Sequence, residues 1–164
     1  MVLIYFLGHK DAGKTTCIHS LISSASFPDL QVIESLDSLT HQSDNFFLFE
    51  QNLDDLLRFG KGTSNFPFSV INGMIFFIDL TDPPRYPEVR MFLYRLLKTS
   101  RFKPDFPIAV FHNKADLVSS ELDWKLSLES LPLQDNSKFG IFTTSSITPD
   151  INVQAFRWLL NEID

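Results

Sequence analysis

The chain has 164 residues, enough for one domain with a buried core, and its formal net charge is −6. Hydrophobic residues make up 44% and charged residues 21% of the sequence, as in folded globular proteins. The acidic balance argues against nucleic acid or an anionic membrane surface as the main partner. The single cysteine, Cys17, excludes an internal disulfide, and the apolar stretch 1–7 is far shorter than the ~20 residues of a membrane-spanning helix. We therefore expect one domain, spanning residues 1–164.

Buried strands alternate with amphipathic helices along the chain. The hydrophobic periodicity predicts strands at 2–7, 46–49, 74–80, 108–112 and 139–143. It predicts helices at 14–24, 88–100, 120–131 and 152–163. Residues 23–43 and 52–72 are rich in Ser, Asp, Asn and Gly, and we expect them to form long loops. This alternation predicts an α/β fold with a mostly parallel sheet and helices on both faces.

A phosphate-binding motif follows the first expected strand. The pattern G-x-x-x-x-G-K-[ST] is matched by Gly8, His9, Lys10, Asp11, Ala12, Gly13, Lys14, Thr15 and Thr16. Its glycines let successive N–H groups point at phosphate oxygens, and the start of the helix adds a partial positive charge. We expect Lys14 to contact the β- and γ-phosphates of a nucleotide and the Thr15 hydroxyl to bind Mg²⁺.

A second motif follows the strand that ends at His112, and it indicates guanine as the base. The residues expected to contact the base are Asn113, Lys114, Asp116 and Leu117, with Thr144, Ser145 and Ser146 after the last strand. Asp116 can accept two parallel hydrogen bonds from guanine, a donor pair that adenine does not offer. The stem of Lys114 can cover the face of the base. Alone, the N-K-x-D pattern is also compatible with a polar turn, but together with the phosphate loop it predicts that GTP or GDP is the ligand.

The two motifs, in this order and after these strands, resemble those of the Ras-like small GTPases, and residues 71–83 resemble their Arf and Sar branch. The sequence is still more similar to the β-subunit family of the signal recognition particle receptor. Asp11 stands at the fourth position of the phosphate loop, as in that family, and residues 92–97 and 150–159 resemble its third and closing helices.

That resemblance implies a P-loop small-GTPase fold and GTP-dependent docking to the N-terminal domain of the receptor α subunit. It also implies a place at the cytosolic face of the endoplasmic reticulum, in co-translational protein targeting. The family normally carries a membrane helix before the first strand, so we expect membrane attachment only through a segment or partner outside this chain. The alternative is an Arf/Sar-like GTPase switch in vesicle traffic. Asp11, the leucine at position 53 in place of a glycine, and the lack of an amphipathic helix before the first strand favour the docking subunit.

The sequence departs from the small-GTPase pattern after the third expected strand. The usual D-x-x-G motif binds Mg²⁺ through its Asp and the γ-phosphate through its Gly, and the next residue, usually Gln, orients the attacking water. Here Glu50 and Leu53 stand at the Asp and Gly positions, and Asp54 follows, unless the alignment is displaced by a few residues. Glu50 could still serve Mg²⁺, whereas Leu53 is ill suited to a glycine conformation and Asp54 would bring negative charge near the γ-phosphate.

Glu50 and Asp54 are therefore the candidate catalytic residues, and we expect slow or absent intrinsic hydrolysis. Thr40 is the candidate for the threonine that small GTPases carry in the first switch segment.

Overall fold

The computed structural model describes residues 1–35, 46–58, 69–98, 105–118, 138–145 and 147–163. Its strands are β1 (Val2–Gly8), β2 (Leu30–Ile33), β3 (Phe46–Asn52), β4 (Gly73–Asp79), β5 (Ile108–Asn113) and β6 (Phe139–Thr143). Its α-helices are α1 (Lys14–Ile22), α2 (Leu53–Arg58), α3 (Tyr86–Lys98) and α5 (Pro149–Glu162). Two short 3₁₀ helices are η2 (Pro83–Arg85) and η3 (Ala115–Leu117).

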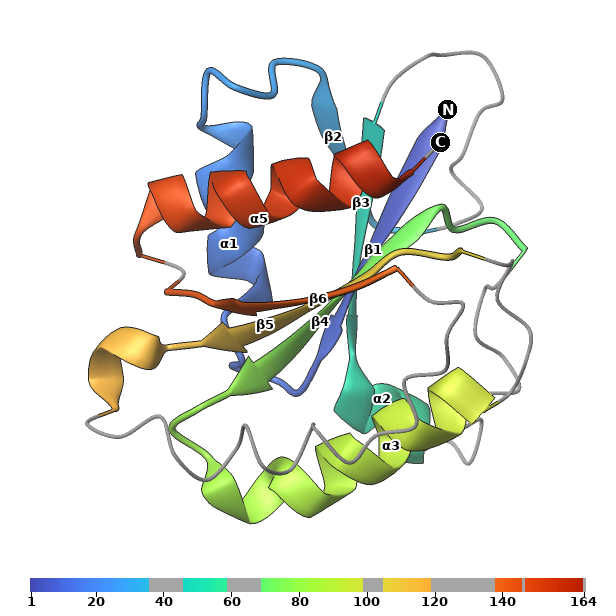
Figure 1. Ribbon diagram of the computed structural model, residues 1–164, viewed down its shortest axis with the longest axis vertical. Coiled ribbons are helices and arrows are strands. Elements are labelled where there is room, and N and C mark those ends of the chain that lie inside the picture. The colour runs from blue at the N-terminus through green and yellow to red at the C-terminus, as the bar shows by residue number, and fades with distance from the viewer. Residues whose placement is uncertain (36–45, 59–68, 99–104, 119–137, 146, 164) are drawn as a thin grey trace.

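The strands form one sheet in the order β2-β3-β1-β4-β5-β6, and every neighbouring pair is parallel. Helices α1 and α5 cover one face of the sheet, and α2 and α3 cover the other (Figure 1). The predicted α/β fold with helices on both faces is confirmed, and all of the described strands are parallel. The chain leaves β1 toward β2 and β3 on one side and later returns to build β4, β5 and β6 on the other.

Both faces of the sheet are buried, which explains the continuous apolar runs of the central strands. Alternate residues of β1 enter two separate clusters, with Leu3 and Tyr5 on the side of α2 and α3, and Ile4 and Phe6 on the side of α1 and α5. Phe156 of α5 is fully buried against the second of these faces, and its ring contacts those of Phe6 and Phe27. The many phenylalanines therefore fill the layers between sheet and helices.

Two expected loops contain regular structure that the sequence analysis missed. Strand β2 lies within 23–43, and helix α2 lies within 52–72. Strand β2 has four residues at the edge of the sheet and exposes Val32, so it carries little hydrophobic alternation. Helix α2 has six residues, too few for a clear helical period, although Leu53, Leu56 and Leu57 do have helical spacing. The predicted helix at 120–131 lies outside the described residues.

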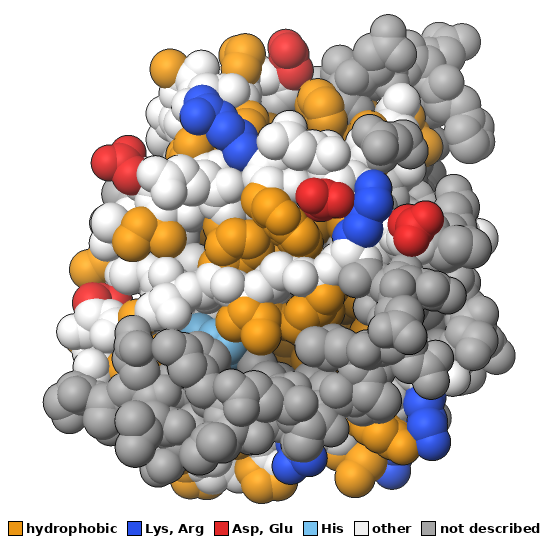
Figure 2. Space-filling model, viewed as in Figure 1, with side chains coloured by type: hydrophobic (Ala, Val, Ile, Leu, Met, Phe, Trp, Pro, Cys, Tyr) orange, Lys and Arg blue, Asp and Glu red, His pale blue; other side chains and the backbone are white. Residues whose placement is uncertain are grey.

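The face shown in Figure 2 carries hydrophobic, acidic and basic side chains side by side. In the part of the chain that the structure describes, no helix combines the length and the apolarity that crossing a membrane requires.

Candidate functional site

The carboxyl ends of four central strands lie at one edge of the sheet, and β4 and β5 extend two residues beyond the end of β1. Gly8 at the end of β1 is opposite Asn52 of β3, and Asp79 at the end of β4 is opposite Asn113 of β5. Strand β1 has β3 on one side and β4 on the other, so the strand order reverses there. Ligands of open α/β sheets bind outside the carboxyl ends of the strands, at such a reversal. The phosphate motif and the N-K-x-D motif both begin at this edge.

The phosphate loop curls around the start of α1. Gly13 has φ 91° and Asp11 has φ 64°, both in the left-handed region, and α1 begins directly afterwards at Lys14. A Cβ on Gly8 would lie 2.8 Å from the carbonyl oxygen of Phe77, so β1 approaches β4 more closely there than a side chain allows. The loop and the end of β3 line an open cavity of about 390 Å³, with Lys10, Asp11, Gly13, Lys14, Thr15, Thr16, Glu50 and Asn52 as its lining residues.

Lys14 is buried, and its ammonium group is held by oxygen atoms. Nζ donates to the carbonyl oxygens of Gly8 at 3.2 Å and His9 at 2.8 Å, and to Oδ1 of Asn52 at 2.8 Å. Burial lowers the pKa of Lys14, and nearby carboxylates, led by Glu50 at 3.8 Å, oppose that shift. A buried cation is therefore fixed in the lining of the cavity, where an anionic ligand would find it.

Thr15 and Glu50 come together at the same cavity. The Thr15 hydroxyl lies 2.8 Å from Oε1 and 2.9 Å from Oε2 of Glu50, and it donates to this carboxylate. Hydroxyl and carboxylate oxygens are the ligands that Mg²⁺ prefers, and Mg²⁺ at nucleotide sites takes few protein ligands. The structure thus brings together the predicted metal residue Thr15 and the candidate Glu50, in an arrangement that fits Mg²⁺.

The second motif is tied to the phosphate loop by a buried side chain. Asn113 is fully buried, and its Nδ2 donates to the carbonyl oxygen of Ala12 at 2.8 Å. Thr144, also buried, donates from Oγ1 to Oδ1 of Asn113 at 3.4 Å and accepts the amide of Ala115 at 3.2 Å. The predicted phosphate and base loops, and the loop after β6, therefore form one connected unit.

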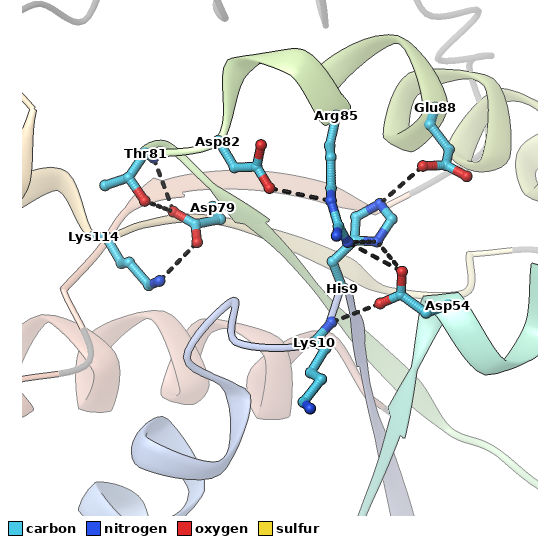
Figure 3. Close-up of polar contacts among 9 residues, drawn as sticks. All are labelled: His9, Lys10, Asp54, Asp79, Thr81, Asp82, Arg85, Glu88 and Lys114. Atoms are coloured by element: carbon cyan, nitrogen blue, oxygen red, sulfur yellow. Dashed lines mark hydrogen bonds and ion pairs between the residues drawn. The ribbon is translucent and has the colours of Figure 1, made fainter.

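Around the expected base position, Lys114 is fixed and Asp116 is exposed. Lys114 has φ 63°, and its Nζ donates to Oδ2 of Asp79 at 2.7 Å, while Thr81 binds the other oxygen of that carboxylate (Figure 3). Burial would raise the pKa of Asp79, but the hydrogen bonds from Lys114 and Thr81 outweigh it and lower the pKa. Asp116 and Leu117 lie on the surface, Leu117 with 68% exposure, so the Asp116 carboxylate is accessible to a ligand.

Asp54 and Leu53 lie at the start of α2, next to the phosphate loop. The Asp54 carboxylate points toward His9 and Arg85, and it accepts the amide of Lys10, a residue that lines the cavity (Figure 3). The negative charge expected near the γ-phosphate is therefore surrounded by cationic and N–H groups. Leu53 is fully buried at the start of α2 and does not need a left-handed backbone, because the chain enters a helix there.

The other predicted site residues divide between the described and undescribed parts of the chain. The amide of Thr144 donates to the carbonyl of His112 at 2.9 Å, so a backbone N–H for the base would have to come from Ser145 or Ser146. Ser146 and Thr40 lie outside the described residues. The sequence analysis missed Asn52, Asp79 and Arg85. Asn52 and Asp79 had a usable signal, since each is a polar residue that ends a buried strand at the binding edge.

The pKa of Asp54 makes its contacts testable through pH. Burial would raise this pKa, but hydrogen bonds from Lys10 and His9 and the charge of Arg85 lower it from 3.8 to about 2. A carboxylate with a lowered pKa stabilises the fold above its unfolded pKa, near 4, and stops doing so as the pH falls toward 2. We expect Asp54→Asn to lower the urea midpoint at about pH 6 and to have a smaller effect at about pH 3. An equal fall of the urea midpoint at both pH values would show that the charge of Asp54 does not stabilise the fold.

The site as a whole fits a nucleotide with Mg²⁺: a cavity at a helix start holds a buried lysine, and a hydroxyl–carboxylate pair lies beside it. The model of the ADP-ribosylation factor family, Arf, matches residues 1–163. This match covers nearly the whole chain and confirms the resemblance to the Arf branch. Members of this family bind GTP or GDP with Mg²⁺ and interact with other proteins through their switch regions. The chain belongs to the ADP-ribosylation factor family of small GTP-binding proteins.

Proposed function

We propose that this domain is a GTP-binding docking subunit of the signal recognition particle receptor, in which bound nucleotide supports the grip on a protein partner and turnover is slow. Its place would be the cytosolic face of the endoplasmic reticulum, with the membrane reached through a segment or partner outside this chain. The partner would be the N-terminal domain of the receptor α subunit. The resemblance at Asp11 and in the third and closing helices supports this assignment within the family.

The nucleotide would be held by groups that the site already gathers. Lys14 and the N–H groups at the start of α1 would bind the phosphates, and Thr15 and Glu50 would hold Mg²⁺, which offsets the phosphate charge. Asp116, accessible at the surface, would accept the two guanine donors. Lys114 is held by Asp79 on the same side of the sheet edge, which fixes the direction of its stem.

One observation favours docking over rapid switching, and it concerns the residue that would orient the attacking water. That residue is Asp54, and its carboxylate is bound by the Lys10 amide at 2.8 Å and by Arg85 at 3.0 Å. With a pKa of about 2 it is ionised at neutral pH and is a poor proton acceptor. The family match supports an Arf/Sar-like switch of vesicle traffic equally well. We prefer the docking subunit because the Asp54 carboxylate is ionised and bound by Lys10 and Arg85.

The partner assignment is tested by direct binding. The domain loaded with GTPγS should form a complex with the N-terminal domain of the receptor α subunit, detected by size-exclusion chromatography and titration calorimetry. A coat component of vesicle traffic serves as the comparison partner. Binding of the comparison partner alone would replace the docking proposal with the vesicle-traffic alternative.

Guanine selectivity is expected to depend on Asp116. Asp116→Asn should weaken the binding of GTP and GDP and improve that of xanthosine nucleotides, because xanthine carries an acceptor where guanine carries its 2-amino donor. Met91→Ala, which alters an exposed side chain of α3 outside both nucleotide-binding loops, should leave the ratio of the two affinities unchanged. Fluorescent nucleotide titrations measure both variants, and an equal loss of both nucleotides would contradict the base assignment.

Intrinsic hydrolysis is expected to be no faster than the ~10⁻⁴ s⁻¹ of an unassisted small GTPase. The domain lacks a water-orienting Gln after Leu53, and the Asp54 carboxylate there is engaged by Lys10 and Arg85. Single-turnover assays with radiolabelled GTP and Mg²⁺ measure the rate. A clearly faster rate without a partner would mean that another group activates the water and would favour the switching alternative.

A further inference from the structure

A polar cluster behind the phosphate loop joins three segments that are distant in sequence. His9 and Lys10 come from the phosphate loop, Asp54 from the first turn of α2, and Arg85 from η2 (Figure 3). Asp54 Oδ2 accepts the amide of Lys10 at 2.8 Å, and Asp54 Oδ1 accepts Nη1 of Arg85 at 3.0 Å. Nδ1 of His9 lies 3.1 Å from the same Oδ1 and 2.9 Å from the same Nη1.

The chemistry of Arg85 determines how His9 takes part. Nδ1 of His9 lies between the Arg85 guanidinium, which can only donate to it, and the Asp54 carboxylate, which can only accept from it, so it bonds to one of them in each tautomer. When Nδ1 accepts from Arg85, a neutral ring carries its proton on Nε2, which faces the Glu88 carboxylate at 3.8 Å. The two hydrogens of Nη1 can reach Asp54 and His9 at once. Arg85 is itself held by Asp82, whose Oδ2 lies 3.1 Å from Nε.

We propose that Arg85 is a positioning residue: through Asp54 and His9 it clamps the first turn of α2 to the phosphate loop. The groups that hold α2 in this clamp, the Lys10 amide and the Arg85 guanidinium, belong to the protein and not to a ligand. Leu53 and Leu56 are buried in the core beneath α2, which gives the helix an apolar anchor on its other side. Helix α2 therefore keeps its place without a contact to the third phosphate.

The clamp also affects which partners can recognise the nucleotide state, a consequence that rests on the proposed nucleotide binding. In small GTPases the glycine of D-x-x-G binds the γ-phosphate and so couples the following segment to the nucleotide state. Here Leu53 occupies that position inside the core, and Asp54 is bound by Arg85. Helix α2 presents the same surface in the GDP and GTP states, so a partner that distinguishes the two states must read another segment.

Hydrogen exchange of peptides covering residues 53–58 tests the clamp. In nucleotide-free protein, Arg85→Met should speed exchange there by roughly three- to tenfold, the range expected for losing a partly exposed charged hydrogen bond. Arg95→Met removes the same charge from an exposed position of α3 and should change nothing in these peptides. Far-UV circular dichroism establishes that both variants are folded, and Arg85→Lys, which retains one donor group, should restore part of the protection.

A spectroscopic measurement separates positioning from general stabilisation. The nitrogen chemical shifts of His9 report how its proton is shared between Nδ1 and Nε2. In Arg85→Met, which cannot donate, the share of the tautomer with a proton on Nδ1, bonded to Asp54, should rise above that of the parent. Asp54→Asn combined with Arg85→Met should expose α2 no more than the larger single effect, because the two residues act as one unit. Additive effects, or unchanged exchange in Arg85→Met, would overturn the proposal.

The nucleotide arm of the experiment compares the parent with GDP and with GTPγS. Exchange of 53–58 should agree between the two complexes within about twofold, and a larger difference would overturn the claim that α2 is insensitive to the third phosphate. Fluorescent GDP titrations of every variant are the control. A parent that binds no nucleotide would contradict the proposed function, whereas the nucleotide-free exchange data would still decide whether Arg85 clamps α2.

Discussion

The phosphate loop and the base loop are joined by a hydrogen bond from the Asn113 side chain to the Ala12 carbonyl, across 101 positions of sequence. Asn113 is fully buried, so losing its amide would deprive that carbonyl of a donor in a place closed to water. The bond can form because β1, β4 and β5 follow one another in the sheet and run parallel, so their carboxyl ends lie at the same edge. A ligand that contacts both loops meets them at a fixed separation.

The same edge keeps a cation buried in a chain of net charge −6. Burying an ammonium group is unfavourable unless it is hydrogen-bonded, and Lys14 donates to two main-chain carbonyls and to Asn52. The carboxylate of Glu50 adds a favourable charge at 3.8 Å. Phosphate oxygens are charged and accept hydrogen bonds more strongly than these carbonyls do. A bound phosphate can therefore replace the carbonyl partners of Lys14 with stronger ones.

Around α2, the departures from the small-GTPase pattern fit one another. A leucine in place of the glycine gives α2 a buried anchor, and the next residue, Asp54, meets Arg85 and the Lys10 amide on the side facing the phosphate loop. Leu53 packs in the core and Asp54 binds Arg85 and the Lys10 amide, whereas the usual residues at these two positions contact the γ-phosphate and the attacking water. The result is a helix that is fixed by core packing and ion pairs, while Thr15, Glu50 and the base loop remain available to a ligand.

The sequence alone determined the fold class and the position of the binding edge. Apolar runs such as 74–80 predict strands buried on both faces, and the two motifs follow directly from strand ends, where the local backbone pattern dictates the chemistry. Glu50 was predicted as a possible Mg²⁺ residue from the resemblance to the small-GTPase pattern after the third strand. The strands, the helices and the two motifs can be predicted because each depends on residues close together in the chain.

Only the tertiary structure decided where Asp54 points and what holds Lys114. The Asp54 carboxylate contacts Arg85 and His9, which lie 31 and 45 positions away along the chain. Asp79 likewise meets Lys114 because β4 and β5 pair in parallel with their ends level. Strand β2 and helix α2 were missed since each is too short to show a period, and pairing with β3 and burial of Leu53 stabilise them. Contacts between residues that are distant in the chain leave no pattern in the local sequence, so only the packed structure shows them.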